Sequence, residues 1–503
     1  MVHSNERDDF SVQQVETDDN EVIEVLDAGQ PEEKKRGISF NILILFAYTL
    51  VLYLFSVYTN VNRPFAYLGG AVLGIAVVTA LFIGRLKSRA VRMLYTLMFM
   101  FVQFGALMQL ILHIEPLDYE PDGLDYFFYL TADEKAFVID MMLPYVAALV
   151  MSLISVFVFK TVMKKHATMK LALLLTVLSA LTYVLTIVFG ISVGGTRVGV
   201  VMFGFTFQPG EFLKYIYCII IGIVLGGGDD KLMQRRLKYA SGVTLMFLGF
   251  MVLQGEFGTF QVVAMSYLII VICYMGVKGI LKLVAFVAAL GIGSTLVYFA
   301  NNYVLKISFL TTQFNKIFDR FRVWLDPDYD IYGAGYQMHQ AMQKIYQAGW
   351  FGQYGSKNTI YAAENDLVIV SIIYAFGLIT ALALVIAFVT MAVNQVRVIS
   401  RTNNSKLKIM AAIASTLLFS QVFFNIGGAT GVIPLSGITL PFISKGGSSI
   451  VSVALMMTLV FMLAVEKEKG GFIDEKTCGY KDTSRAFGGG DSAGHSTDAG
   501  NSV

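Results

Sequence analysis

Ionisable side chains interrupt the apolar sequence at places where a charge is costly, and they are the residues most able to do chemistry. In FQPGEFLKYIY (207–217), Gln208, Glu211 and Lys214 recur every three residues and share one face of a helix that begins near Pro209. Charged groups within a membrane-spanning helix usually mark a binding or catalytic site. The alternative is an interfacial Glu–Lys pair that only anchors the helix end.

Two other segments carry carboxylates beside apolar runs. Glu256 lies in QGEFGT (254–259), between two such runs, and Asp366 lies in YAAENDLVIVSIIYAFG (361–377), where a polar loop ends and an apolar run begins. On position alone, an Asp at the start of a helix is more often a cap than a catalyst. Glu364, two residues earlier, is the alternative acid.

The segment NIGGATGVIPLSGITLPFISKGGSSI (425–450) has no apolar run long enough to cross a bilayer. Pro434, Pro441 and several glycines break any helix there. Irregular backbone at membrane depth is tolerated only where it is buried in protein or lines a wet cavity. An ordinary Gly/Pro-rich extracellular turn is the alternative.

The composition indicates that most of the chain lies in a membrane, because 56% of the 503 residues are hydrophobic and the mean hydropathy is +0.64. A net charge of +2 gives no reason to expect a nucleic acid partner. The cysteines (218, 273, 478) are far apart and the five histidines are scattered. We therefore expect neither a disulfide framework nor a metal site, and no cofactor motif is present. The polar first 36 residues do not resemble a signal peptide.

Apolar runs of about 20 residues predict an all-α membrane bundle of about twelve spans. They lie near 39–58, 66–84, 93–113, 138–159, 170–190, 209–226, 238–253, 257–276, 281–303, 367–393, 409–430 and 448–465. Lysine and arginine gather in alternate short connections, at 85–92, 160–170, 231–238, 278–282 and 397–408. This pattern places both termini in the cytoplasm and a long loop, 304–366, outside.

The chain divides into a membrane domain and two polar tails. Residues 1–37 and 467–503 are too polar to bury a core, and we expect both to be disordered cytoplasmic tails. Residues 38–466 form the polytopic membrane domain. No internal repeat supports an inverted-repeat transporter, which is the least favoured interpretation.

These motifs resemble, in order along residues 194–450, those of the SEDS family (FtsW, RodA and SpoVE), membrane glycosyltransferases that polymerise lipid II. GGTRVGVVMFGFTF (194–207) is similar to the family's Gly-Ala-x-Arg-Trp stretch, and RFRVWLDPDYDIYGAGYQMHQ (320–340) to its Asp-Pro…Gly-Tyr-Gln-x-x-Gln segment. The family core has about ten helices, here the last ten, so the first two spans are additions. The chain departs from the family at Val198, Gly210, Gly255, Glu256, Ile331, Tyr374, Ala375 and Lys445. In that order, the family motifs have Trp, Ser, Pro, Asp, Pro, Glu, Glu and Tyr.

The resemblance implies an inverting peptidoglycan glycosyltransferase that takes lipid II, a polyprenyl-pyrophosphate-linked disaccharide peptide. Asp366 takes the place of the family's essential acid. The implied substrate-binding residues are Arg197, Gln208, Glu211, Lys214, Glu256, Gln337, Gln340, Lys445, Ser448 and Ser449. A class B penicillin-binding protein is the implied partner and the bacterial cell membrane the implied location. The sequence does not decide between division, elongation and sporulation, or whether a divalent cation assists.

The departures keep a second interpretation open, in which a SEDS-like protein without catalytic activity binds or translocates a lipid-linked precursor or scaffolds a penicillin-binding protein. The discriminating feature is whether Asp366 faces the same cavity as Arg197 and Lys214.

The charge pattern makes a direct prediction about topology. In intact cells, a membrane-impermeant maleimide should label Lys357→Cys in the long loop and leave Asn403→Cys unlabelled. Labelling at 403 with protection at 357 would invert the proposed orientation.

Overall fold

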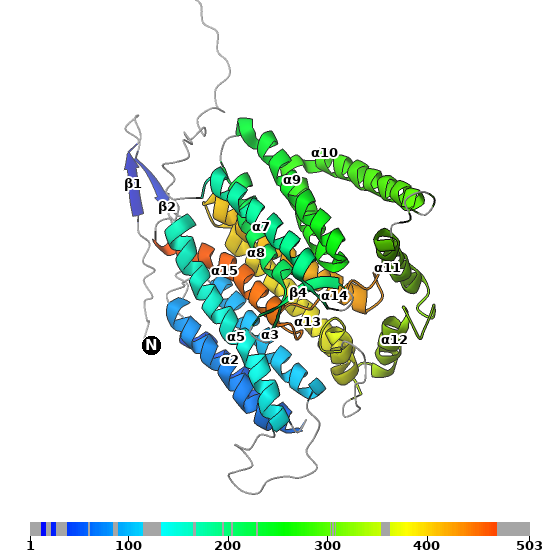
Figure 1. Cartoon of the computed structure of the whole chain (residues 1–503). Coiled ribbons are helices and arrows are strands. Elements are labelled where there is room, and N and C mark those ends of the chain that lie inside the picture. Colours follow the sequence, from blue (N-terminus) through cyan, green and yellow to red (C-terminus); the bar gives the residue numbers. More distant parts are fainter. Residues whose placement is uncertain are drawn as a thin grey trace, which may run out of the picture.

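A computed structural model shows a bundle of long helices, with two shorter helices at one side (Figure 1). The structure describes residues 12–16, 22–26 and 38–469, apart from gaps at 59–60, 84–88, 114–131, 164–166, 194–195, 203–204, 228–229, 302, 304–305, 307 and 354–362. In the N-terminal tail, which we expected to be disordered, strands β1 (Val12–Glu16) and β2 (Val22–Leu26) pair antiparallel. The acidic connection at 115–130 and the C-terminal tail beyond 469 lie outside the described residues.

Every predicted apolar run lies on a helix, so the prediction of an all-α membrane bundle is confirmed. The first runs form α1 (Ile38–Tyr58), α2 (Asn62–Ile83), α3 (Arg89–His113), α5 (Ala132–Val158, extended by the π-turn Phe159–Met163) and α7 (Met169–Phe189). The next form α8 (Pro209–Leu225), α9 (Asp230–Gln254) and α10 (Phe257–Ala300). The last form α13 (Val368–Ser400), α14 (Ser405–Ala429) and α15 (Gly447–Lys469).

Within the described part of the chain, seven helices are long and apolar enough to cross a membrane, and shorter apolar segments lie in α1, α2 and α15. Helix α10 carries two of the predicted runs. They are divided by a kink at Gly276, where the backbone leaves the helical region (φ 56°). A positive φ is accessible to glycine at little cost, so the kink falls where the sequence has no side chain.

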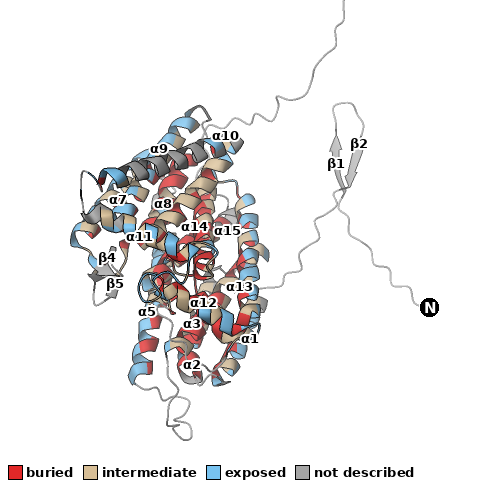
Figure 2. Ribbon diagram, turned by 90° about the vertical axis from the view of Figure 1, so that its right-hand side faces the viewer, coloured by how far each residue is buried: buried red, intermediate tan, exposed pale blue. Residues whose placement is uncertain are grey.

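The bundle buries α8 at its centre, while the outer faces of α1, α5 and α7 stay apolar and exposed (Figure 2). Helix α8 packs against α14, α7, α15 and α9. Its contact with α14 is close, because a Cβ at Gly222 would collide with the side chain of Met410. An apolar exterior around a buried core is the arrangement that lipid requires, so the chain is a multi-pass membrane protein.

Two parts of the chain depart from a simple helix bundle. Between α7 and α8 the chain forms a small antiparallel sheet of β3 (Ile191–Val193), β4 (Thr196–Met202) and β5 (Phe205–Phe207). The predicted long loop folds into two helices, α11 (Ser308–Leu325) and α12 (Tyr336–Ala348). Residues 308–353 of the loop are therefore a structured part of the protein.

Candidate active site

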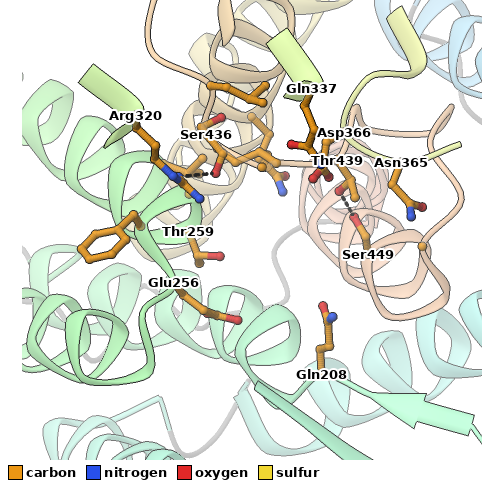
Figure 3. Close-up of a pocket in the computed structure, with 18 of the residues that line it drawn as sticks. Gln208, Glu256, Thr259, Arg320, Gln337, Asn365, Asp366, Ser436, Thr439 and Ser449 are labelled. Atoms are coloured by element: carbon orange, nitrogen blue, oxygen red, sulfur yellow. Dashed lines mark hydrogen bonds between the residues drawn. The ribbon is translucent and has the colours of Figure 1, made fainter. Parts of the chain in front are cut away.

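A cavity of about 1090 Å³ lies where the start of α8, the α9–α10 connection, α11, α12 and the irregular segment 430–446 meet (Figure 3). Residues far apart in the sequence converge on it from these elements. Nine of the predicted site residues line it: Gln208, Glu211, Lys214, Glu256, Gln337, Asp366, Lys445, Ser448 and Ser449.

Two predicted residues are not shown to reach the cavity. Gln340 lies on α12 one turn beyond Gln337 and is not part of the cavity lining. Arg197 lies on β4, where its backbone pairs with Ser192, and its side chain is outside the described residues. Asp366 and Lys214 therefore share one cavity, whereas the side chain of Arg197 is not placed in it.

The deep end of the cavity holds a buried ion pair on α8. Lys214 Nζ lies 2.7 Å from Glu211 Oε2, and the side chains are only 1% and 13% exposed. A lysine this well buried is retained only with a partner, because an unpaired charge out of water is very costly. The pair therefore lies inside the protein and does not match an exposed membrane anchor.

Glu256 reaches the same region from the turn between α9 and α10, because Gly210 leaves room for it. A Cβ at Gly210 would lie 3.1 Å from Glu256 Oε2. At these positions the SEDS motifs have Ser and Asp. Glutamate is longer than aspartate, and Glu256 occupies the space that a serine side chain at position 210 would need. The two departures therefore compensate each other sterically.

The pKa of Glu256 is raised to about 7. Burial is the main cause, and the nearby charge of Glu211 raises the pKa further. Lys214 and a hydrogen bond from Thr259 act in the opposite direction. Near neutral pH this carboxyl can therefore hold or release a proton.

Asp366 stands on a turn whose successive backbone carbonyls are each held by a side chain. Gln109 Nε2 donates to the carbonyl of Glu364 (3.0 Å), Ser444 Oγ to that of Asn365 (2.7 Å), and Asn425 Nδ2 to that of Asp366 (2.9 Å). The same amide groups of Gln109 and Asn425 also donate to the carbonyls of residues 443 and 438, at 3.0 and 2.6 Å. The turn is thus fixed to the irregular segment from three sides.

This geometry does not fit a capping role for Asp366. Helix α13 has Leu367 at its N-cap position, with no side-chain cap hydrogen bond. Instead the Asp366 carboxylate points into the cavity (Figure 3). Burial raises its pKa, and the positive charge of Arg320 partly opposes that rise.

Glu364 lies at the cavity rim and is already engaged. Its Oε2 is 3.1 Å from Lys445 Nζ, and its Oε1 is 3.4 Å from His113 Nδ1. Lys445 and His113 both pack against the ring of Phe137, at 4.6 and 4.0 Å. Lys445, which stands where the family has Tyr, therefore neutralises the alternative acid.

Sequence reasoning missed several cavity residues, among them Thr259, Arg320, Gln421, Ser436 and Thr439. Thr439 and Ser449 share a hydrogen bond of 2.9 Å across the irregular segment (Figure 3). Gln421 is 1% exposed on α14, and its Oε1 has no hydrogen-bond partner among the described residues. The one signal available was polarity inside an apolar run, which singles out Gln421.

Comparison with known proteins gives one family and a consistent set of relatives. The family model FTSW_RODA_SPOVE, described as cell cycle protein, matches residues 126–469. Peptidoglycan glycosyltransferase RodA of Mycobacterium tuberculosis is 27% identical over 283 residues, 53% of this chain and 57% of that protein. Probable peptidoglycan glycosyltransferase FtsW of Idiomarina loihiensis is 26% identical over 309 residues, 59% of this chain and 71% of that protein.

The first of these relatives is matched over little more than half its length. Among solved structures, a chain from a peptidoglycan synthase complex that coordinates polymerization and crosslinking aligns with a TM-score of 0.56 at 20% identity. The alignment covers 75% of this chain and 98% of that one. At this identity the likeness establishes the fold alone.

The raised pKa of Glu256 predicts a stability that depends on pH. Between its ordinary value of 4.5 and about 7, the folded protein holds a proton that the unfolded chain releases, so stability falls as pH rises through this window. Glu256→Gln stays neutral at every pH. We expect it to melt a few degrees above the unsubstituted protein at pH 8 and at the same temperature near pH 4.5. An equal difference at both pH values would contradict the assignment.

Proposed function

Since the chain belongs to the FtsW/RodA/SpoVE family of cell cycle proteins, we propose that it is a peptidoglycan glycosyltransferase that polymerises lipid II into glycan strands. The observation that carries the proposal is the convergence of Asp366 and Lys214, from segments about 150 residues apart, on one cavity. The names of the relatives support the same activity.

The cavity suits a lipid-linked sugar substrate. Its volume of about 1090 Å³ is at the upper end of the range for small-molecule sites. The substrate has an apolar tail, an anionic pyrophosphate and a polar disaccharide-peptide. Apolar walls such as Leu112, Val262 and Leu435 adjoin the cations Lys214 and Lys445 and the carboxylate of Asp366. Each part of the substrate thus meets a surface of matching polarity.

In the proposed mechanism, Asp366 takes the proton from the hydroxyl of the acceptor sugar. The acceptor oxygen then bonds to the anomeric carbon of the donor from the side opposite the leaving group. The bond to the polyprenyl pyrophosphate breaks, its electron pair leaves with the phosphate oxygen, and the configuration inverts. Lys214 and Lys445 offset the negative charge that develops, and Arg197 joins them in this proposal.

The same proposal covers partner and orientation. Growing glycan strands need crosslinking, and the solved relative comes from a complex that coordinates polymerization and crosslinking. We therefore propose a class B penicillin-binding protein as the partner. The bacterial cell membrane is the proposed location, with both termini cytoplasmic and α11 and α12 outside, as the basic short connections require.

Asp366→Asn tests the activity directly. The amide cannot accept the proton, and general bases typically contribute about 10²–10⁴-fold to rate. We expect polymerisation of purified lipid II to fall by about that factor, while the protein still accumulates in the membrane with its melting temperature close to unchanged. Gel analysis of labelled lipid II, with the candidate partner present, provides the measurement.

Asp328→Asn is the matched control, because Asp328 lies on the same outer region, is 81% exposed and pairs with His339 outside the cavity. It should polymerise normally. Loss in Glu364→Gln with an active Asp366→Asn would move the base to Glu364. Normal polymerisation by both variants, or none by the unsubstituted protein with its partner, would favour a precursor-binding protein without catalytic activity.

A further inference from the structure

Helix α11 presents two different faces, and one of them brings an arginine to the reaction centre. Lys316, Asp319, Arg320, Val323 and Trp324 line the cavity. Phe318, Phe321 and Leu325 stay exposed on the other side. Trp324 Nε1 donates to the carbonyl of Gly431 at 3.0 Å, which fixes the rotation of the helix against the irregular segment.

The Arg320 guanidinium is held by that segment. Its Nη1 donates to the carbonyl of Ser436 at 3.1 Å (Figure 3). This carbonyl is the one hydrogen-bond acceptor that the described residues offer Arg320. A guanidinium has five N–H donors in a rigid fork, so one anchored nitrogen sets the direction of the others.

Gly437, the next residue, adjoins both Arg320 and Asp366. Gly437 has φ +71° and no side chain. A Cβ there would lie 3.5 Å from Asp366 Oδ2 and 3.8 Å from Arg320 Nη2. The carboxylate and the guanidinium therefore border the same small space, which the glycine leaves open on the cavity side.

The other charged groups around Asp366 are largely committed elsewhere. Glu364 pairs with Lys445, and Glu211 with Lys214. Asp319, on α11, lies 3.7 Å from Arg322, while Lys316 on the same helix has other interactions. Glu256, at the deep end, interacts with the charges of Glu211 and Lys214. Arg320 is the cation whose charge acts on Asp366.

We propose that Arg320 is a positioning residue for glycosyl transfer: it keeps Asp366 ionised and directed at the space above Gly437, where the acceptor hydroxyl is deprotonated. The inference rests on the proposed function. Burial alone disfavours a carboxylate, and a neutral Asp366 cannot take a proton. Arg320 favours the ionised form without occupying the place of the substrate, because both groups border the space that Gly437 leaves open.

The test compares Arg320→Gln with Arg322→Gln. Arg322 carries the same charge two residues along the helix, but its side chain is exposed and lies outside the cavity. Removing the cation raises the pKa of Asp366. As the pH is lowered, the variant should therefore lose polymerisation at a higher pH than the unsubstituted protein does. The ionised fraction of a carboxyl falls about tenfold for each pH unit below its pKa. We expect Arg320→Gln to lose about tenfold or more of the rate on the acid side of the profile and to recover part of this loss at alkaline pH. Arg322→Gln should match the unsubstituted profile.

Arg320→Lys separates charge from geometry and serves if the glutamine variant does not accumulate. It should keep the acid midpoint of the pH profile and lose rate, because its ammonium lacks the planar fork of the guanidinium. A midpoint unchanged in Arg320→Gln, or an Arg320→Lys variant with an unchanged rate, would overturn the proposal. Both results presuppose an active unsubstituted protein, so an inactive one speaks against the proposed function instead.

Discussion

The arrangement of the site depends on how three consecutive peptide carbonyls, at 364, 365 and 366, obtain hydrogen-bond donors. They lie on a turn that belongs to no helix. The backbone N–H of Lys445 donates to the carbonyl of Glu364 at 2.9 Å, and side chains supply the other donors. A buried carbonyl without a donor is costly. Gln109, Ser444 and Asn425 supply the donors from α3, the irregular segment and α14. Because Gln109 and Asn425 also hold carbonyls of the irregular segment, one set of amides fixes both walls of the cavity.

Charge pairing is the second constraint, and it explains why so many ionisable groups can share one cavity. Lys214 neutralises Glu211 at the deep end, and Lys445 neutralises Glu364 at the rim. Asp366 and Arg320 differ from these pairs, because both border the open space at Gly437 and no direct ion pair joins them in the described part of the chain. In a direct ion pair the two charges contact each other and leave no space for substrate. A separated pair leaves room for the reacting hydroxyl of the substrate beside both charges.

Hydropathy was sufficient to predict the long helices, because a helix that crosses lipid needs about 20 apolar residues wherever its neighbours lie. The irregular segment was predictable for a related reason, since Pro434 and Pro441 cannot continue a helix. Arg320 and Asn425 were not, because each is an ordinary polar residue until the fold places it beside Asp366. The folding of the long loop into α11 and α12 was missed because its turn residues, Asp326 to Gly335, dominate the pattern.

Four of the departures from the family pattern fall into two physical groups, and the polar groups that line the cavity do not depend on either. Gly210 and Glu256 exchange volume with each other while keeping a carboxylate in place. Tyr374 and Ala375 do not line the cavity. They lie where α13 meets the end of α12: Lys344 Nζ is 4.0 Å from the Tyr374 ring, and a Cβ at Gly352 would press against the Ala375 backbone. An acidic pair at 374–375 would change how the outer helices attach to the bundle, whereas the carboxylate and cations of the cavity come from other elements and stay in place without it.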